Sequence, residues 1–280
     1  MNKAGIIFRV QKGRRHVYLL GTIHIPISFF PKTYTRYSEF IEASDNSFFE
    51  LCSTLPESLN LIYRLPPCNV HDIWTPTQIQ QFYDLFQSTF KLPCPIEVED
   101  MIIPLMIICE HLTSWIIHKL YRNINQSDPI LDDSLIKKSK KCHSLDTNES
   151  MAETLNILCI SEHESAKQRL TPAKIISGIN RRIQNRLKMA HYLETGNLHK
   201  LEQLVNTPWI TPSQIDNEIL SNAEYIFTQK RNNMWMNKIL PFVRDTRSHT
   251  TVAVGVAHLL GPGSLIQLFE DNGYIIEIVS

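Results

Sequence analysis

The sequence predicts an α/β fold of the α+β kind: a mixed sheet built from N- and C-terminal strands, flanked and capped by a long helical middle region. Strand-like apolar runs cluster at both ends of the 280-residue chain, and helical spacing dominates between them. Two of the terminal strands also end at a glycine that a histidine follows three positions later. We expect strands mainly in 1–52, 141–147 and 249–280, helices in 53–240, and one domain over 1–280.

The N-terminal strands are expected to form a hairpin. "GIIFRV" and "HVYLLGTI" flank "QKGRR", which supplies a glycine-containing turn. "NSFFELC" (Asn46 to Cys52) and "KCHSLDT" (Lys141 to Thr147) predict two further short strands. At the C-terminus, "TTVAVGVA", "GPGSLIQLFEDNG" and "YIIEIVS" read as strand, helix and strand. This order predicts a parallel strand pair joined by a right-handed crossover.

The helical middle region has clear start signals. Three Thr-Pro pairs precede helical spacing: Thr75-Pro76, Thr171-Pro172 and Thr211-Pro212. Threonine caps the free amides of a first turn, and proline at the first helical position has no amide to lose. The longest apolar region, Met101 to Leu120, contains Pro104 and Glu110, so it predicts a buried helix and not a membrane span.

The charge balance restricts the class of partner. Lys and Arg number 28, and so do Asp and Glu, whereas nucleic-acid binders usually carry a basic excess. We therefore expect no nucleic-acid partner. The interruptions of the apolar region 101–120 separately predict no transmembrane segment. The oligomeric state stays open.

The cysteines bear on the compartment. The six cysteines are Cys52, Cys68, Cys94, Cys109, Cys142 and Cys159, and none lies in a C-x-x-C pair. This spacing disfavours a zinc ribbon or a thioredoxin-type site. Scattered cysteines in a chain of this length favour a reducing compartment. We expect a cytoplasmic location, with export without a cleaved signal as the alternative.

The Gly-x-x-His spacing occurs four times, more often than this composition gives by chance. The pairs are Gly13/His16, Gly21/His24, Gly196/His199 and Gly255/His258. Only the second and fourth follow strand-like runs. Ligands of open α/β sheets bind at the carboxyl ends of the strands, so these two histidines are placed where a site is expected.

Two interpretations of His24 and His258 remain open from the residues alone. Either each histidine caps its strand by bonding to a backbone carbonyl, or both converge on one ion or substrate. Glu50 interrupts the apolar run "SFFEL", where a carboxylate without a partner is costly to bury. It either faces solvent from an edge strand or completes a His-His-carboxylate metal site.

At these residues the sequence resembles the TraB/PrgY/GumN family, to whose superfamily the Wnt-cleaving Tiki proteases belong. "YLLGTIHIP", "FFEL", "RNNMWMNKIL" and "TVAVGVAHLLGPGSLIQLFEDNGYIIEIV" follow the family pattern in order and spacing. The resemblance is strongest over residues 16–51 and 228–279. In the middle it is looser, and Asp146 stands where the family usually has Glu. The related erythromycin esterase and ChaN-like folds imply two α/β halves facing across a cleft.

The resemblance implies a metallopeptidase-like hydrolase with a peptide or protein substrate, because Tiki-type relatives are metal-dependent proteases and other members act on peptide pheromones. It implies a divalent ion (Mn, Co or Zn) held by His24, Glu50 and His258. Glu50, Arg231 and Asn232 would then be the catalytic residues. Further candidate residues at the same site are Asp146, Gly21 and Gly255. The alternative is a non-catalytic, regulatory protein that binds a peptide or haem in the same cleft.

Overall fold

The computed structural model describes residues 4–52, 70–98, 105–120, 128–154, 171–206, 225–244 and 248–279. Its strands form one six-stranded mixed sheet in the order β4-β3-β5-β2-β1-β6. The strands are β1 (Ile7–Lys12), β2 (Arg15–Thr22), β3 (Asn46–Phe49), β4 (Cys142–Ser144), β5 (Thr250–Gly255) and β6 (Ile275–Ile278). The predicted fold class is confirmed, since strands from both ends of the chain share this sheet.

The predicted hairpin is present. β1 and β2 pair antiparallel with Val10 opposite Val17, and Gly13 turns the chain between them at a φ of +64°. A positive φ is strained for residues with a Cβ, which explains the glycine in this turn. β5 lies in the centre of the sheet and pairs in parallel with β2 on one side and β3 on the other. Parallel strands covered on both faces are rich in apolar residues, as the central "VAV" of β5 is.

The predicted parallel pair at the C-terminus is wrong. β6 runs in the same direction as β5, but it pairs antiparallel with β1, so β2 and β1 lie between the two strands. The reason is that both edges of β5 are already occupied by β2 and β3. The second strand of this unit therefore takes the free edge of β1.

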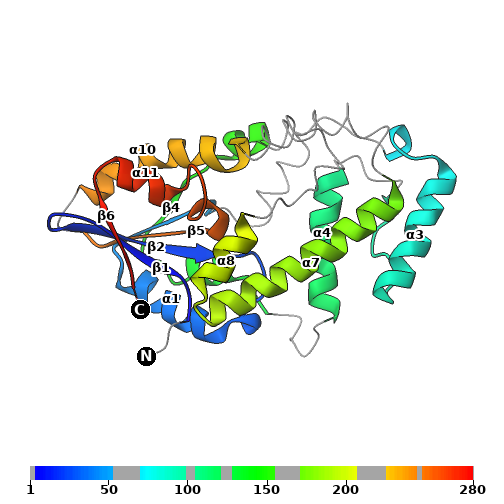
Figure 1. The fold of residues 1–280 in the computed structure, drawn as a ribbon, viewed down its shortest axis with the longest axis horizontal. Coiled ribbons are helices and arrows are strands. Elements are labelled where there is room, and N and C mark those ends of the chain that lie inside the picture. The colour runs from blue at the N-terminus through cyan, green and yellow to red at the C-terminus, as the bar shows by residue number, and fades with distance from the viewer. Residues whose placement is uncertain are drawn as a thin grey trace.

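The helices surround the sheet. They are α1 (Pro31–Ala43), α3 (Pro76–Phe90), α4 (Leu105–Leu120), α5 (Leu131–Ile136), α7 (Pro172–Glu194), α8 (Leu198–Val205), α10 (Arg231–Val243) and α11 (Leu265–Asp271). A further helix includes 148–154, and short helical turns are η1 (Ile27–Phe29), η2 (Val70–Asp72), η4 (Tyr225–Lys230) and η5 (Val256–His258). Figure 1 shows α10 and α11 on one face of the sheet and α1 on the other.

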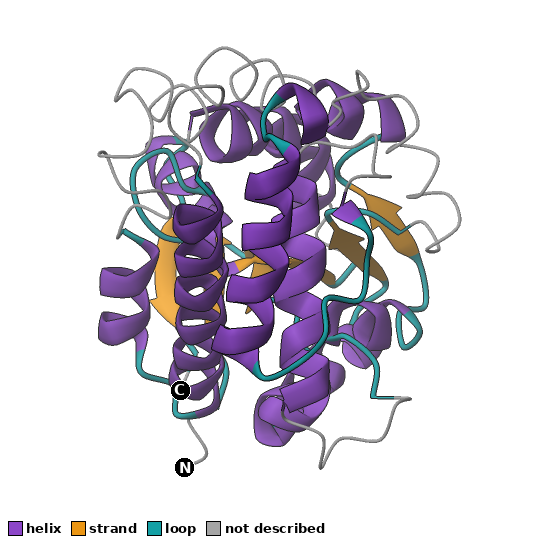
Figure 2. Cartoon of the chain, turned by 90° about the vertical axis from the view of Figure 1, so that its right-hand side faces the viewer, coloured by secondary structure: helices purple, strands orange, loops and turns teal. Residues whose placement is uncertain are grey.

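The middle helices stand beyond the ends of the parallel strands. The arrowhead of β2 points toward the side where α4, α7 and α3 are gathered (Figure 1), and Figure 2 shows helices in front of the sheet from that side. Thr75 caps α3 in a full capping box and Thr171 caps α7, as the Thr-Pro pairs predict. The third pair, Thr211-Pro212, lies outside the described residues. No helix within the described ranges is long and apolar enough to cross a membrane.

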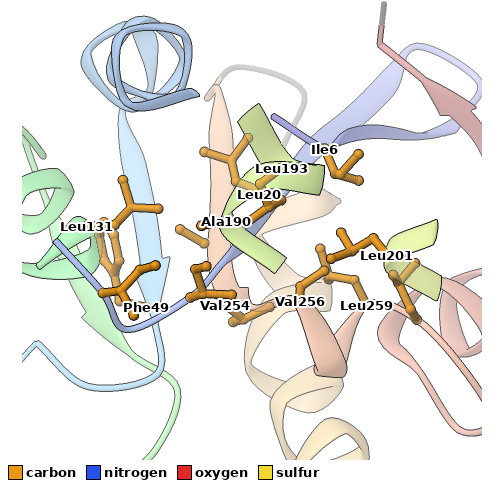
Figure 3. Close-up of a cluster of buried hydrophobic side chains, with 14 of the residues drawn as sticks. Ile6, Leu20, Phe49, Leu131, Ala190, Leu193, Leu201, Val254, Val256 and Leu259 are labelled. Carbon is orange, nitrogen blue, oxygen red and sulfur yellow. The ribbon is translucent and has the colours of Figure 1, made fainter. Parts of the chain in front are cut away.

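The sheet and the helices share one apolar core. In Figure 3, Leu20 and Val254 from adjacent strands lie in the same cluster as Ala190 and Leu193 of α7. Leu20, Val254 and Leu193 are fully buried. Burying one such side chain stabilises the fold by roughly 1.5–3 kcal/mol, so this core fixes the position of α7 over the sheet.

A disulfide joins Cys52, just after β3, to Cys142, the first residue of β4, with their Cα atoms 6.4 Å apart. The two cysteines are separated by 90 positions in the sequence. Cysteine spacing alone therefore does not reveal the pair. The disulfide weakens the inference that scattered cysteines indicate a reducing compartment.

Candidate functional site

The polar residues of the site lie where the parallel strands end. Glu50 follows β3, and His258 closes the short turn η5 that follows β5. The N–H of Gly255, at the end of β5, donates to Glu50 Oε1 at 2.8 Å. A Cβ at this glycine would lie 3.0 Å from the same oxygen. Gly255 therefore permits the approach of the carboxylate, which is a physical reason for the glycine in this motif.

Gly21 has a different reason for being glycine. A Cβ at Gly21 would lie 3.1 Å from a side-chain carbon of Val256, the residue that opens η5. The absence of a side chain at Gly21 lets β2 and η5 pack closely. The two motif glycines thus bring the turn that carries His258 against β2 and against Glu50.

Arg231, the first residue of α10, is the centre of the site. Its guanidinium donates from Nη2 to Glu50 Oε2 at 2.7 Å and from Nε to Asp146 Oδ2 at 3.1 Å. Nη1 lies 3.2 Å from Nε2 of His258. Only 5% of Arg231 is exposed. One buried cation therefore holds two carboxylates and an imidazole together, in the planar, multidentate geometry for which guanidinium is suited.

The charged groups of this cluster and their burial shift one another's pKa values. Burial acts to raise the pKa of Glu50, but His258, Arg231 and His24 outweigh it and hold that pKa well below its usual range. Burial likewise opposes the charged form of Arg231, yet Glu50 and Asp146 raise its pKa overall. Glu50 is consequently ionised and Arg231 charged at neutral pH.

The hydrogen bonds of Asn232 define the tautomer of His258. The Nδ2 of Asn232 donates to the backbone oxygens of His258 at 3.2 Å and Gly263 at 2.9 Å. Its Oδ1 is therefore an acceptor, and Nδ1 of His258, 2.8 Å away, carries the hydrogen. Burial lowers the pKa of His258 to about 4. The imidazole is thus neutral at pH 7, with the lone pair of Nε2 directed at Arg231 and 3.9 Å from Glu50 Oε1.

His24 stands in a separate, more open environment. Its Nδ1 faces Asp132 Oδ2 at 3.2 Å, and Asp132 Oδ1 accepts a hydrogen bond of 2.7 Å from Thr22. The side chain of His24 is 57% exposed and that of Asp132 is 14% exposed. Asp132 raises the pKa of His24 to about 9. His24 is therefore a cation at neutral pH whose charge is felt at Glu50.

Trp235 completes the site, and the sequence analysis missed it. Its Nε1 donates to Asp146 Oδ1 at 3.0 Å, and its ring lies 4.6 Å from the guanidinium carbon of Arg231. The ring of His258 is 4.4 Å away, measured between centroids. Trp235 lies four positions after Arg231 in one helix, a spacing that places two side chains on one face. That spacing is the signal that indicates Trp235, and Asp132 has no comparable signal.

Of the six predicted site residues with polar side chains, the structure brings five together and leaves one apart. Glu50, Asp146, Arg231, Asn232 and His258 form one hydrogen-bonded cluster. His24 has its ion pair with Asp132 instead. The protonation states of Glu50 and His258 suit a divalent metal ion, which binds carboxylates and neutral imidazoles. Within the described ranges, however, no three His, Cys, Asp or Glu side chains form a group that could hold such an ion.

Comparisons with known proteins bear on the whole chain. The model of the TraB/PrgY/gumN family matches residues 6–278. A comparison with curated proteins found no match, and neither did one with solved structures.

Proposed function

This chain belongs to the TraB/PrgY/gumN family, and we propose that it is a metal-dependent peptide hydrolase whose active site is the cluster around Arg231. The observation that carries the proposal is the state of His258. Its Nδ1 donates to Asn232, so the electron pair of the neutral imidazole is on Nε2, which accepts from Arg231 and lies 3.9 Å from the ionised carboxylate of Glu50. A neutral imidazole beside a carboxylate at the end of parallel strands is suited to metal ligation and proton transfer.

In this proposal His24, Glu50 and His258 would hold a divalent ion, Mn, Co or Zn, and His24 would lose its proton on binding, because a metal ligand must be a neutral imidazole. When bound, such an ion lowers the pKa of a water molecule and polarises the carbonyl to be cleaved. Both histidines have the support that metal-ligating histidines usually have: an oxygen atom faces each Nδ1, from Asp132 for His24 and from Asn232 for His258. Each imidazole therefore presents Nε2.

The residues of the chain have separate roles in peptide cleavage. Arg231 supplies positive charge that stabilises an oxyanion as it develops, and it holds Glu50 through a bond of 2.7 Å. Asn232 keeps the lone pair of His258 on Nε2. Asp146 and Trp235 orient Arg231, because Asp146 accepts from Nε of Arg231 and the ring of Trp235 lies 4.6 Å from its guanidinium carbon. Arg231 would have to release Nε2 of His258 for that nitrogen to hold the ion, since Nη1 lies 3.2 Å from it.

The test has two arms. Metal analysis of the purified protein, and its melting temperature with and without Mn²⁺, Co²⁺ or Zn²⁺, should show a bound or stabilising ion, with the stabilisation lost in His24→Ala and His258→Ala. Incubation with a peptide library, followed by mass spectrometry, should give cleavage products with the wild type and none with His258→Ala. Absence of any metal effect and of any product would contradict the proposal.

One observation favours the second candidate, a regulatory protein that binds a peptide or haem without turnover. Arg231 donates to Glu50 and lies within hydrogen-bond distance of His258, so both groups already have a partner inside the cluster. This candidate predicts stoichiometric capture of the ligand and intact peptides in the same mass spectrometry experiment.

The disulfide changes the location that we propose. Disulfides persist in oxidising compartments and are rare in the cytosol, and Cys52–Cys142 joins two segments of this site. We therefore place the site in an oxidising compartment in this proposal, in preference to the cytoplasm. Thiol counting on protein rapidly acid-quenched from its own cells tests this: a reactive pair at Cys52 and Cys142 would contradict it.

A further inference from the structure

The edge strand β4 has backbone groups that face away from the sheet. Ser47 N donates to Lys141 O and Leu145 N donates to Phe49 O, so alternate residues of this segment bond to β3. The residues between them, Cys142 and Ser144, therefore direct their N–H and C=O groups outward. Within the part of the chain that the structure describes, these outward groups have no hydrogen-bond partner, and Ser144 is exposed.

A cavity of about 500 Å³ lies beside this edge, between β4 and α10. Its apolar lining is a cluster of three rings: Phe48 and His143 are stacked 4.8 Å apart, and Phe242 lies 5.0 Å from His143. Pro241 adds to this lining. A volume of this size is sufficient for a large apolar side chain, and aromatic walls favour such a group over a charged one.

The same strand leads into the proposed active site. Two residues after Ser144 comes Asp146, which binds Arg231. At about 3.3 Å per residue, a chain lying along β4 would reach the Arg231 cluster within roughly two residues of the strand's end. The edge is also held in place, because Cys142 is disulfide-bonded to Cys52, whose N–H donates to Ser144 Oγ at 2.8 Å.

We propose that the open edge of β4 binds an extended segment of the peptide substrate as an added strand, with one large apolar side chain of the peptide in the cavity beside His143. The outward N–H and C=O groups of Cys142 and Ser144 recur at the two-residue spacing of an extended peptide, which can satisfy all of them. The inference rests on the proposed function, because it assigns the substrate-binding part of that site. The opposite edge, β6, is separated from β4 by four strands and does not lead into the Arg231 cluster.

Two variants of one residue separate the backbone contact from the side chain. Ser144→Pro removes the outward N–H without removing a bond to β3, and proline is tolerated at such edge positions. Ser144→Ala keeps the N–H. Both variants lose the hydroxyl that accepts from Cys52, so they form a matched pair. A third variant, Asn237→Trp, fills the cavity from the exposed face of α10 without cutting into the core.

The probe is a library of unstructured decapeptides, incubated with each variant in the cold and separated from free peptide by size exclusion. Mass spectrometry then identifies captured peptides and products. Ser144→Ala should capture the same peptides as the wild type, and Ser144→Pro at least tenfold less, with the melting temperature and near-ultraviolet circular dichroism of the two variants alike. Asn237→Trp should lose the captured peptides that carry large apolar residues.

Equal capture by Ser144→Pro and Ser144→Ala would overturn the proposal, as would no capture by the wild type. If the edge instead binds a second copy of this chain, light scattering would show a dimer that Ser144→Pro abolishes, and that outcome also overturns it. Cleavage products whose yield does not depend on residue 144 would support the proposed hydrolase and overturn peptide binding at the β4 edge. Capture that depends on residue 144, with no cleavage products, would support peptide binding at the β4 edge and contradict the proposed hydrolase.

Discussion

The two Gly-x-x-His segments of this protein have the same spacing and opposite surroundings. His258 is 6% exposed, and burial lowers its pKa to about 4, while an amide oxygen holds its Nδ1. The side chain of His24 is 57% exposed, and the carboxylate of Asp132 at its Nδ1 raises its pKa to about 9. The motif thus places a histidine at the end of a strand, whereas its surroundings decide its charge: burial for His258, and the carboxylate opposite Nδ1 for His24.

The largest effect on stability is expected at Arg231, the cation that contacts His258 and lies in the surroundings of that histidine and not of His24. Arg231→Met leaves Glu50 and Asp146 buried without their common partner, and removing one partner of a buried ion pair costs about 3–5 kcal/mol. Urea denaturation measures this loss in the free energy of unfolding. Arg182→Met is the matched control: its partner Glu110 is 44% exposed, so a cost of about 1 kcal/mol or less is expected. Equal costs for the two variants would contradict the central role of Arg231.

The disulfide is predicted to support the His258 half of the site more than the His24 half. Cys52 follows Glu50 by two residues, and Cys142 precedes Asp146 by four. The double variant Cys52→Ser/Cys142→Ser should lose about 2–4 kcal/mol of stability, as is typical of a disulfide that closes a long loop. NMR should show shifted ring signals for His258 and unchanged ones for His24. Single variants serve as controls, since each already lacks the bond, and they should match the double variant.

The next prediction exchanges the two environments. Asn232→Asp gives His258 a carboxylate at Nδ1, as His24 has, and should raise its pKa from about 4. Asp132→Asn gives His24 an amide and should lower its pKa from about 9 toward the ordinary value of 6.5. NMR titration of the two ring signals measures both shifts. If neither pKa moved in the stated direction, the group opposite Nδ1 would not contribute to the difference between the two histidines. Asp133→Asn, an exposed neighbour of Asp132, is the control.

The smallest effects concern stability against pH, and they have opposite signs for the two histidines. The pKa of His24 is raised by folding, so its contribution is present below pH 6.5 and is lost as the pH rises toward about 9. The pKa of His258 is lowered, so its contribution is present above pH 6.5 and is lost as the pH falls toward about 4. Comparing unfolding curves of the wild type and His24→Gln from pH 6 to 10 isolates the first. Comparing His258→Gln from pH 7 to 4 isolates the second, and a difference in the same window for both variants would refute the assignment.

The local elements of the fold were predictable because their signals are contained in short segments. The hairpin of β1 and β2 follows from alternating apolar runs around Gly13, and the starts of α3 and α7 follow from Thr75 and Thr171. The place of β6 was not predictable in this way, because its partner is chosen by which strand edge is still free.

The proposed site likewise has features that short segments of sequence indicate and features that only the tertiary structure reveals. The sequence by itself determined that His24 and His258 follow strands and that Glu50, Arg231 and Asn232 are candidates for one site. Only the tertiary structure decided that Arg231 bridges Glu50 and Asp146, which lie 181 and 85 positions away from it, and that Asp132 and not Glu50 is the ion-pair partner of His24. The physical reason is that spacing along the chain fixes the local backbone, whereas the charge of a side chain depends on neighbours that the sheet order brings to it.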